Sequence, residues 1–356
     1  MSPRTDYRSL LGCVLALALM LACAIPHESG AKSEGPVRLL SKARSAVWPA
    51  QCGSDGSRCL RELTLPGGAR LAAYSNVPMT GSARVTHAML VVHGAGRDAA
   101  VTFTGMMQAA VKAGADVEQT MVLAPWFKTA QDSPASGEAV WSSGGWKIGD
   151  PSTGRGGEPI SSFQVADDLL YTWADRTRFP NLRWVTVVGH SAGGQFTDRY
   201  ATFGQAPGRV PGVLVNFIVA NPSSFVYFDQ QRPNGNPSSC AGYDTYKYGM
   251  AGRSGYVAQM SPRQALTTFL SRRVSILNGS ADTVQNGDMD EGCGGMLQGA
   301  NRLARGENFF ARMRSIAPSA PHDRIVVPGV THDHYALFED PRSATVLFGT
   351  TAPARE

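Results

Sequence analysis

The run Gly189-His190-Ser191-Ala192-Gly193 restricts the possible fold of this chain more than any other segment. An apolar, β-branched run at residues 182–188 comes before it and predicts a buried strand. Phe196, Tyr200 and Phe203 follow at helical spacing and predict one face of a helix. The segment therefore predicts a sharp strand-to-helix turn, a nucleophile elbow, which holds a serine hydroxyl exposed above a sheet.

Length and composition are those of an ordinary globular protein. The chain has 356 residues, of which 43% are hydrophobic and 17% charged, which suits one large α/β domain or two small ones. The formal net charge is +5, and the basic residues are scattered. The densest basic run, Arg302, Arg305, Arg312 and Arg314, has helical spacing and predicts the solvated face of a helix. We expect no nucleic-acid partner.

The amino terminus has the pattern of a targeting segment. Arg4 and Arg8 precede an apolar stretch at residues 10–25, which predicts a cleaved secretory signal over residues 1–24. Alternatively, the four residues that end at Cys23, Met-Leu-Ala-Cys, resemble a bacterial lipoprotein box. We therefore expect a secreted or periplasmic protein, with lipidation at Cys23 as the alternative that would anchor it in the cell envelope.

Four cysteines remain after the signal: Cys52, Cys59, Cys240 and Cys293. An even number in an exported chain indicates disulfides, for which three connectivities are possible. The pairs Cys52–Cys59, which closes a tight loop, and Cys240–Cys293 are favoured. A metal site is the rival interpretation, but no C-x-x-C pair occurs and no histidines cluster near these cysteines, so we expect none.

The order of apolar segments predicts the architecture. After a flexible arm at residues 25–51, a domain at residues 52–350 alternates strands with helices, which predicts one parallel sheet with helices on both faces. Residues 59–74 predict two short strands around a turn. The other predicted strands lie at residues 88–92, 120–124, 182–188, 213–219, 273–277 and 324–327.

Two irregular, cap-like insertions interrupt this alternation, at about residues 127–160 and 222–260. Both follow strands, so both are expected at the carboxyl edge of the sheet, where open α/β folds bind ligands. The first contains the segment Trp-Ser-Ser-Gly-Gly-Trp at residues 141–146, and the second is rich in aromatic residues. These aromatic side chains either wall a substrate pocket or pack the loops against the body of the domain.

A serine nucleophile needs a base and a group that orients the base. His332, in the loop after the last predicted strand, is the preferred base, with His334 as its competitor. Asp282, directly after the strand at residues 273–277, is the expected acid that holds the imidazole. Ser191, Asp282 and His332 then follow one another in chain order.

Donors for an oxyanion are expected from two backbone segments. The N–H of Ala192 and an N–H of the glycine-rich loop at residues 93–97, that of Ala95, form the predicted oxyanion hole. His93 is expected to brace this loop and His190 to support the elbow, whereas His322 is interpreted as an exposed loop residue.

These motifs together resemble the α/β-hydrolase superfamily over roughly residues 60–348. The match consists of the His93-Gly94 loop, the elbow at Ser191, the acid at Asp282 and the histidine at His332. More narrowly, the chain resembles secreted bacterial and fungal members that carry a Trp-Ser-Ser-Gly-Gly-Trp segment and have no well-defined substrate. The resemblance implies an α/β-hydrolase fold, with an eight-stranded, mostly parallel sheet, and a serine-hydrolase mechanism.

Lipases and esterases with an HGGG loop differ from this chain, because Ala95 and Arg97 interrupt the glycine run, so their substrate preference does not carry over. The expected function is an exported, carboxylesterase-like serine hydrolase acting on a small-molecule ester, without metal or organic cofactor. An amidase, peptidase or thioesterase would use the same residues, and a catalytically silent binding protein on this fold is a further alternative.

Overall fold

A computed structural model of the chain describes residues 48–155, 157–285 and 288–349. The chain divides into two units, Met1–Ala43 and Arg44–Glu356, and all of the described residues belong to the second. The predicted signal peptide, the lipidation at Cys23 and most of the flexible arm lie outside the described residues and stay predictions.

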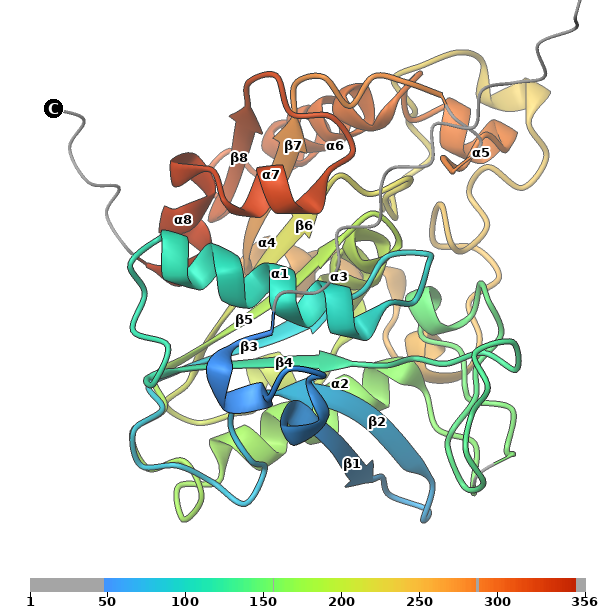
Figure 1. Ribbon diagram of the computed structural model, residues 1–356. Helices are drawn as coiled ribbons and strands as arrows, with labels where there is room; N and C mark the ends of the chain where they lie inside the picture. The colour runs from blue at the N-terminus through green and yellow to red at the C-terminus, as the bar shows by residue number, and fades with distance from the viewer. Residues whose placement is uncertain (1–47, 156, 286–287, 350–356) are drawn as a thin grey trace, which may run out of the picture. The chain divides into compact units, whose positions relative to one another are not determined.

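The described part contains an eight-stranded sheet with the order β1-β2-β4-β3-β5-β6-β7-β8 (Figure 1). β1 pairs antiparallel with β2, and β2 antiparallel with β4. The remaining pairs are parallel. The predicted mostly parallel, eight-stranded sheet is therefore confirmed. The strands are β1 (Leu60–Thr64), β2 (Arg70–Ser75), β3 (His87–Val92), β4 (Thr120–Pro125), β5 (Trp184–His190), β6 (Leu214–Ala220), β7 (Arg273–Gly279) and β8 (His322–Val327).

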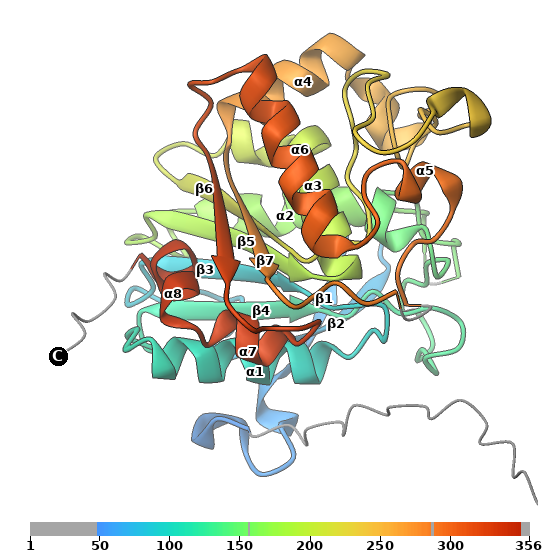
Figure 2. The same ribbon diagram turned by 90° about the horizontal axis from the view of Figure 1, so that it is seen from above.

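Helices cover both faces of the sheet, as predicted. Figure 2 shows α1, α7 and α8 on one face and α2, α3, α4 and α6 on the other. Each face has its own apolar core, so the inner strands are covered on both sides. β3 and β4 are buried along their whole length, which explains why they are continuous apolar runs. The α-helices are α1 (Ala99–Lys112), α2 (Ser162–Ala174), α3 (Ala192–Phe203), α4 (Pro262–Ser271), α5 (Cys293–Met296), α6 (Arg302–Ile316), α7 (His334–Phe338) and α8 (Pro341–Phe348).

Ser161 and Gln164 stand three residues apart at the start of α2, a spacing that allows a capping box. Ser161 is the N-cap, and its hydroxyl accepts a hydrogen bond from the Phe163 N–H at 3.1 Å. Gln164 does not complete a capping box, because its amide donates instead to Asp168, one turn further on, at 2.9 Å. The helix therefore begins with only half of the reciprocal cap.

Both favoured disulfides are present. Cys52 is bonded to Cys59, and Cys240 to Cys293. The first closes a loop of sequence separation 7, and the second links positions 53 residues apart. Among the helices that the structure describes, none is both long and apolar enough to cross a membrane.

The interpretation of the basic run as a solvated helix face is wrong for its first two members. Arg302 and Arg305 lie on α6 and are fully buried. They share their helix face with Phe309 and Met313, which are also buried, because these positions recur at helical spacing. The Arg305 guanidinium donates to backbone carbonyl oxygens, among them that of Gly299 at 2.9 Å. The burial of the Arg305 cation is therefore compensated by these hydrogen bonds.

His322 is not an exposed loop residue, contrary to expectation. It is the first residue of β8 and is buried. Its Nε2 lies 3.1 Å from the Phe269 carbonyl oxygen, and its ring packs edge-on against the Phe269 ring. Burial is the main cause that lowers the pKa of His322. The strand starts two residues earlier than predicted, which accounts for the error.

Aromatic residues of the second insertion pack into the body of the domain. Phe225, Tyr227 and Tyr256 are buried, and the Phe225 ring stacks on Phe309 of α6 with centroids 4.4 Å apart. The Tyr256 hydroxyl donates to the carboxylate of Asp167 on α2. Of the two predicted roles, these side chains therefore pack the insertion against the body of the domain.

Candidate active site

The predicted elbow is a strained turn between β5 and α3. Ser191 has φ 60° and ψ −117°, a conformation that side-chain-bearing residues rarely adopt. The flanking glycines leave no room for a side chain: a Cβ at Gly193 would overlap the Val92 carbonyl oxygen, and one at Gly189 would overlap the Gly193 backbone. The small residues around Ser191 are therefore a packing requirement of the turn.

His332 and Asp282 lie together at the ends of neighbouring strands. Asp282 follows β7 and His332 follows β8, and these two strands pair in parallel. The His332 Nδ1 lies 2.7 Å from the Asp282 Oδ2, a charge-assisted hydrogen-bond distance. The Ala281 N–H donates to the Val330 carbonyl oxygen at 2.9 Å, which ties the two loops together. Nδ1 is thus used by the carboxylate, and Nε2 remains for other chemistry.

His334, the competing base, does not occupy this position. It begins α7, and its ring centroid lies 5.9 Å from that of His190. His190 itself packs against His332 with ring centroids 4.3 Å apart. Burial, followed by the charges of His332 and His334, lowers the pKa of His190 well below its usual value. A neutral imidazole therefore lies beside the His332 ring.

The buried guanidinium of Arg302 contacts the carboxylate of Asp282. Arg302 Nη1 lies 3.5 Å from Asp282 Oδ1, while Oδ2 of the same carboxylate contacts His332. Both Arg302 and Asp282 are fully buried. The two oxygens of Asp282 therefore contact two different basic side chains.

The predicted oxyanion residues line one cavity with the serine. Ser191, Ala192 and Ala95 all border a cavity of about 270 Å³. His93 braces the loop as expected: its Nδ1 lies 3.0 Å from the Gly94 carbonyl oxygen, and its Nε2 accepts the Phe127 N–H at 3.1 Å. Burial lowers the pKa of His93 to about 4, so the ring is neutral and can accept that bond.

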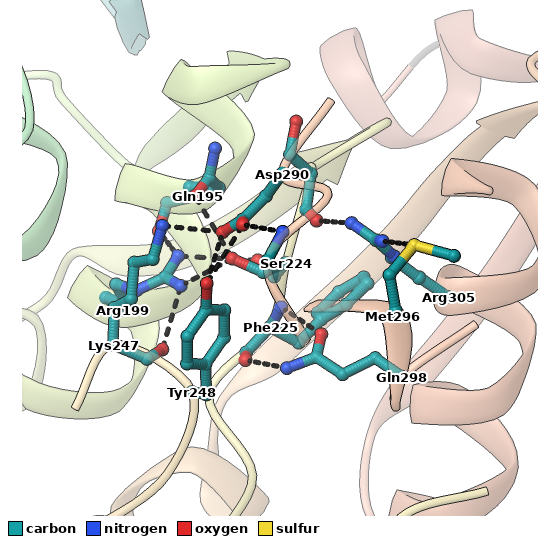
Figure 3. Close-up of polar contacts among 12 residues, drawn as sticks. Gln195, Arg199, Ser224, Phe225, Lys247, Tyr248, Asp290, Met296, Gln298 and Arg305 are labelled. Atoms are coloured by element: carbon teal, nitrogen blue, oxygen red, sulfur yellow. Dashed lines mark hydrogen bonds and ion pairs between the residues drawn. The ribbon is translucent and has the colours of Figure 1, made fainter. Parts of the chain in front are cut away.

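The walls of this cavity are charged rather than aromatic. Lys147, Lys247, Asp288, Asp290 and Glu291 line it. The Lys247 ammonium lies 2.5 Å from the Asp290 carboxylate, and the Tyr248 hydroxyl donates to the same carboxylate at 2.9 Å (Figure 3). Aromatic side chains of the second insertion do not appear among the described lining residues.

A polar network fixes the wall of the cavity next to Ser191. Gln195, one turn along α3, accepts the Ser224 hydroxyl at 3.1 Å (Figure 3). The Arg199 guanidinium donates to the Ser224 oxygen at 3.1 Å and to the Lys247 carbonyl oxygen at 2.9 Å. The second insertion is thereby bonded directly to α3, which begins at the elbow.

A larger cavity of about 490 Å³ lies elsewhere. It is lined by residues at the amino-terminal ends of β6 and β7, including Leu214, Asn216 and Arg273. None of the predicted site residues borders it. Ligands of open α/β folds bind at the opposite, carboxyl ends of the strands, so the smaller cavity is the candidate site. In the part of the chain that the structure describes, no group of three or more His, Cys, Asp or Glu side chains could hold a metal ion.

Three residues in or beside the candidate site were not predicted from the sequence: Lys147, Lys247 and Arg302. Lys147 directly follows the Trp-Ser-Ser-Gly-Gly-Trp segment, which could have indicated its place at the site. The burial of Arg302 was readable from its spacing to Phe309 and Met313. Lys247 lies in an irregular insertion, and no local pattern marks it.

Comparison with known proteins identifies the fold. No family model matches the chain, and no curated protein does. Among solved structures, poly(aspartic acid) hydrolase-1 from Sphingomonas sp. KT-1 is 22% identical, with a TM-score of 0.55, over 78% of this chain and 95% of that one. LpqC from Bordetella parapertussis, described as a poly(3-hydroxybutyrate) depolymerase, is 18% identical, with a TM-score of 0.59, over 82% and 89% of the two chains. The chain has the fold of the α/β-hydrolase superfamily.

Proposed function

We propose that the protein is an exported serine hydrolase that cleaves a carboxylic ester through an acyl-enzyme on Ser191. One observation carries the proposal: a serine in a strained elbow occurs in the same fold as a histidine bonded to a carboxylate at 2.7 Å. The hydroxyl, the base and the orienting acid that such a reaction requires all follow strands of one sheet.

In the first half of the reaction, the Ser191 oxygen attacks the ester carbonyl carbon and His332 Nε2 takes the serine proton. Asp282, which accepts from Nδ1, holds the imidazole in the required tautomer and stabilises the imidazolium. The N–H groups of Ala192 and Ala95 donate to the oxyanion that forms on the carbonyl oxygen. The C–O bond then breaks, and the alcohol leaves with the proton from His332.

In the second half, water replaces the alcohol. His332 takes a proton from the water, whose oxygen attacks the acyl carbon of the acyl-enzyme. The collapse of the second tetrahedral intermediate returns the proton to the Ser191 oxygen and releases the carboxylic acid. Every proton transfer uses His332, so no further acid or base is required.

Export is supported by the two disulfides, because such bonds persist in oxidising compartments. Mass spectrometry of the mature amino terminus tests this part of the proposal. Cleavage after Ala24 would show a plain signal, and a lipidated Cys23 at the terminus would show an envelope anchor. A mature chain that still begins at Met1 after expression in its native host would contradict export.

Hydrolysis of a p-nitrophenyl ester series from short to long acyl chains tests the reaction. We expect an optimum at a short chain, because the cavity beside Ser191 has a volume of only about 270 Å³. The control is Ser191→Ala, which removes the nucleophile. Ester turnover that persists in this variant would refute the mechanism. An amide series belongs in the same assay because poly(aspartic acid), which names one structural neighbour, is joined by amide bonds.

A further inference from the structure

Lys147 is a cation held inside the cavity of Ser191. It lies in the short 3-10 helix η3 (Trp146–Ile148), within the first insertion. It lines the same cavity as Ser191 and Ala95 and is half-buried. A lysine in such a position is available to a substrate that occupies the cavity.

The Trp-Ser-Ser-Gly-Gly-Trp segment fixes the place of this lysine. Trp146, directly before it, is fully buried and packs edge-on against His93, with ring centroids 4.6 Å apart. The Trp146 ring also stacks on Phe127 at 6.1 Å, and the Ser162 hydroxyl donates to the Trp146 carbonyl oxygen at 2.6 Å. The backbone that carries Lys147 is therefore packed against the histidine that braces the oxyanion loop.

Among the described lining residues, Lys247 is the other cation, and it is already paired with Asp290 at 2.5 Å. Arg199, which fixes the wall of the cavity, donates to Ser224 and to the Lys247 carbonyl oxygen. Asp290 is the carboxylate whose charge acts on Lys147, and it is itself paired with Lys247 at 2.5 Å. A partly buried ammonium whose neighbouring carboxylate is already paired is unfavourable, and a bound anion would reduce that cost.

We propose that Lys147 binds a carboxylate of the substrate, and that the enzyme therefore prefers esters that carry an anionic group over neutral esters of the same size. This inference rests on the proposed function, because it assigns the substrate class of the same cavity. A carboxylate would pair with Lys147 while the scissile carbonyl faces Ser191. The cavity volume of about 270 Å³ restricts the carboxylate to a position within a few carbon atoms of the scissile bond.

The pH dependence of binding follows from the surroundings of Lys147. Burial, followed by the nearby charges of Lys247 and Arg199, lowers the pKa of Lys147 to about 8, and Asp290 opposes the shift. The ammonium is therefore mostly charged at pH 7 and loses its charge as the pH rises through 8. For the wild-type enzyme, we expect the KM of an anionic ester to rise between pH 7 and pH 9 relative to that of a neutral ester.

The test compares matched pairs of esters. The first pair, mono-p-nitrophenyl glutarate and p-nitrophenyl pentanoate, places the charge on the acyl side. The second pair, 4-carboxyphenyl acetate and phenyl acetate, places it on the leaving group. The measured quantity is the ratio of kcat/KM, anionic over neutral, in wild type, Lys147→Met and Lys147→Arg.

We expect Lys147→Met to lower this ratio about tenfold or more in at least one pair, since a charged hydrogen bond is lost, and Lys147→Arg to restore part of it. Lys112→Met is the control: it removes the same charge from an exposed position on α1, where Lys112 pairs with Glu339, and is expected to leave the ratio unchanged.

An unchanged ratio for Lys147→Met in both pairs would overturn the inference while leaving the hydrolase intact. Absence of Ser191-dependent turnover of all four esters by the wild-type protein would instead refute the proposed function. The two failures are therefore distinguishable.

Discussion

Replacing Ser191 by glycine is expected to stabilise the protein while it abolishes activity. The serine holds φ 60° and ψ −117°, a region that costs a residue with a Cβ about 1–3 kcal/mol. Glycine adopts this conformation freely but loses more backbone entropy on folding, which costs about 0.5–1 kcal/mol. The difference predicts that Ser191→Gly has a larger free energy of unfolding than Ser191→Ala, by up to about 2.5 kcal/mol. Both variants lack the hydroxyl, so their difference in stability isolates the effect of the backbone conformation at position 191.

The assay is urea denaturation of both variants, with the free energy of unfolding extrapolated to water. Ala192→Gly is the matched control, because position 192 begins α3 with an ordinary helical role and glycine in a helix costs up to about 1 kcal/mol relative to alanine. We therefore expect glycine in place of alanine to raise the free energy of unfolding at position 191 and to lower it at position 192. A Ser191→Gly variant that is no more stable than Ser191→Ala would refute the argument that the elbow stores strain.

Further variants test other parts of the structure. Asp282→Asn should lower the kcat of ester hydrolysis about 10⁴-fold, because an amide at the 2.7 Å contact would hold His332 in the wrong tautomer. Steady-state kinetics measure this loss, and a loss below tenfold would contradict the role assigned to Asp282. Gly193→Ala should lower the melting temperature by at least several degrees, since its Cβ would overlap the Val92 carbonyl oxygen; calorimetry that shows no change would contradict the packing argument. Replacing Cys240 and Cys293 by alanine should lower the free energy of unfolding by about 4 kcal/mol, because this bond closes a separation of 53 residues. The same change at Cys52 and Cys59, a separation of 7, should lower it by about 2 kcal/mol. Equal losses for the two double variants in urea denaturation would contradict the loop-entropy explanation.

The parts of the fold that the sequence predicted well are those with local causes. The elbow was visible because strand, tight turn and helix are contiguous, and the steric demand for small residues at positions 189 and 193 is local too. Asp282 and His332 were placed near each other by one further inference, that parallel strands end at the same edge. Their hydrogen bond agrees with that placement, while their catalytic roles await the experiments above.

The parts that were predicted wrongly depend on tertiary packing. Arg302 and Arg305 are charged residues on a helix, which usually face water. Here Arg302 contacts the carboxylate of Asp282 and Arg305 donates to the Ser223 carbonyl oxygen, both outside this helix. The charged lining of the cavity also depends on tertiary packing, because Lys147 and Lys247 belong to two irregular insertions that meet only in the folded chain. Irregular segments carry no periodicity from which the direction of a side chain can be read.

The order of the strands in the sheet also has a kinetic consequence. Ala95, Ser191, Asp282 and His332 follow β3, β5, β7 and β8, so the site combines segments from residue 95 to residue 332. Parallel strands pair only after long crossover connections have closed, and such distant contacts slow folding. During refolding, helix content should therefore recover first and ester hydrolysis last. The rate at which activity returns then reports the assembly of β3, β5, β7 and β8 into one sheet.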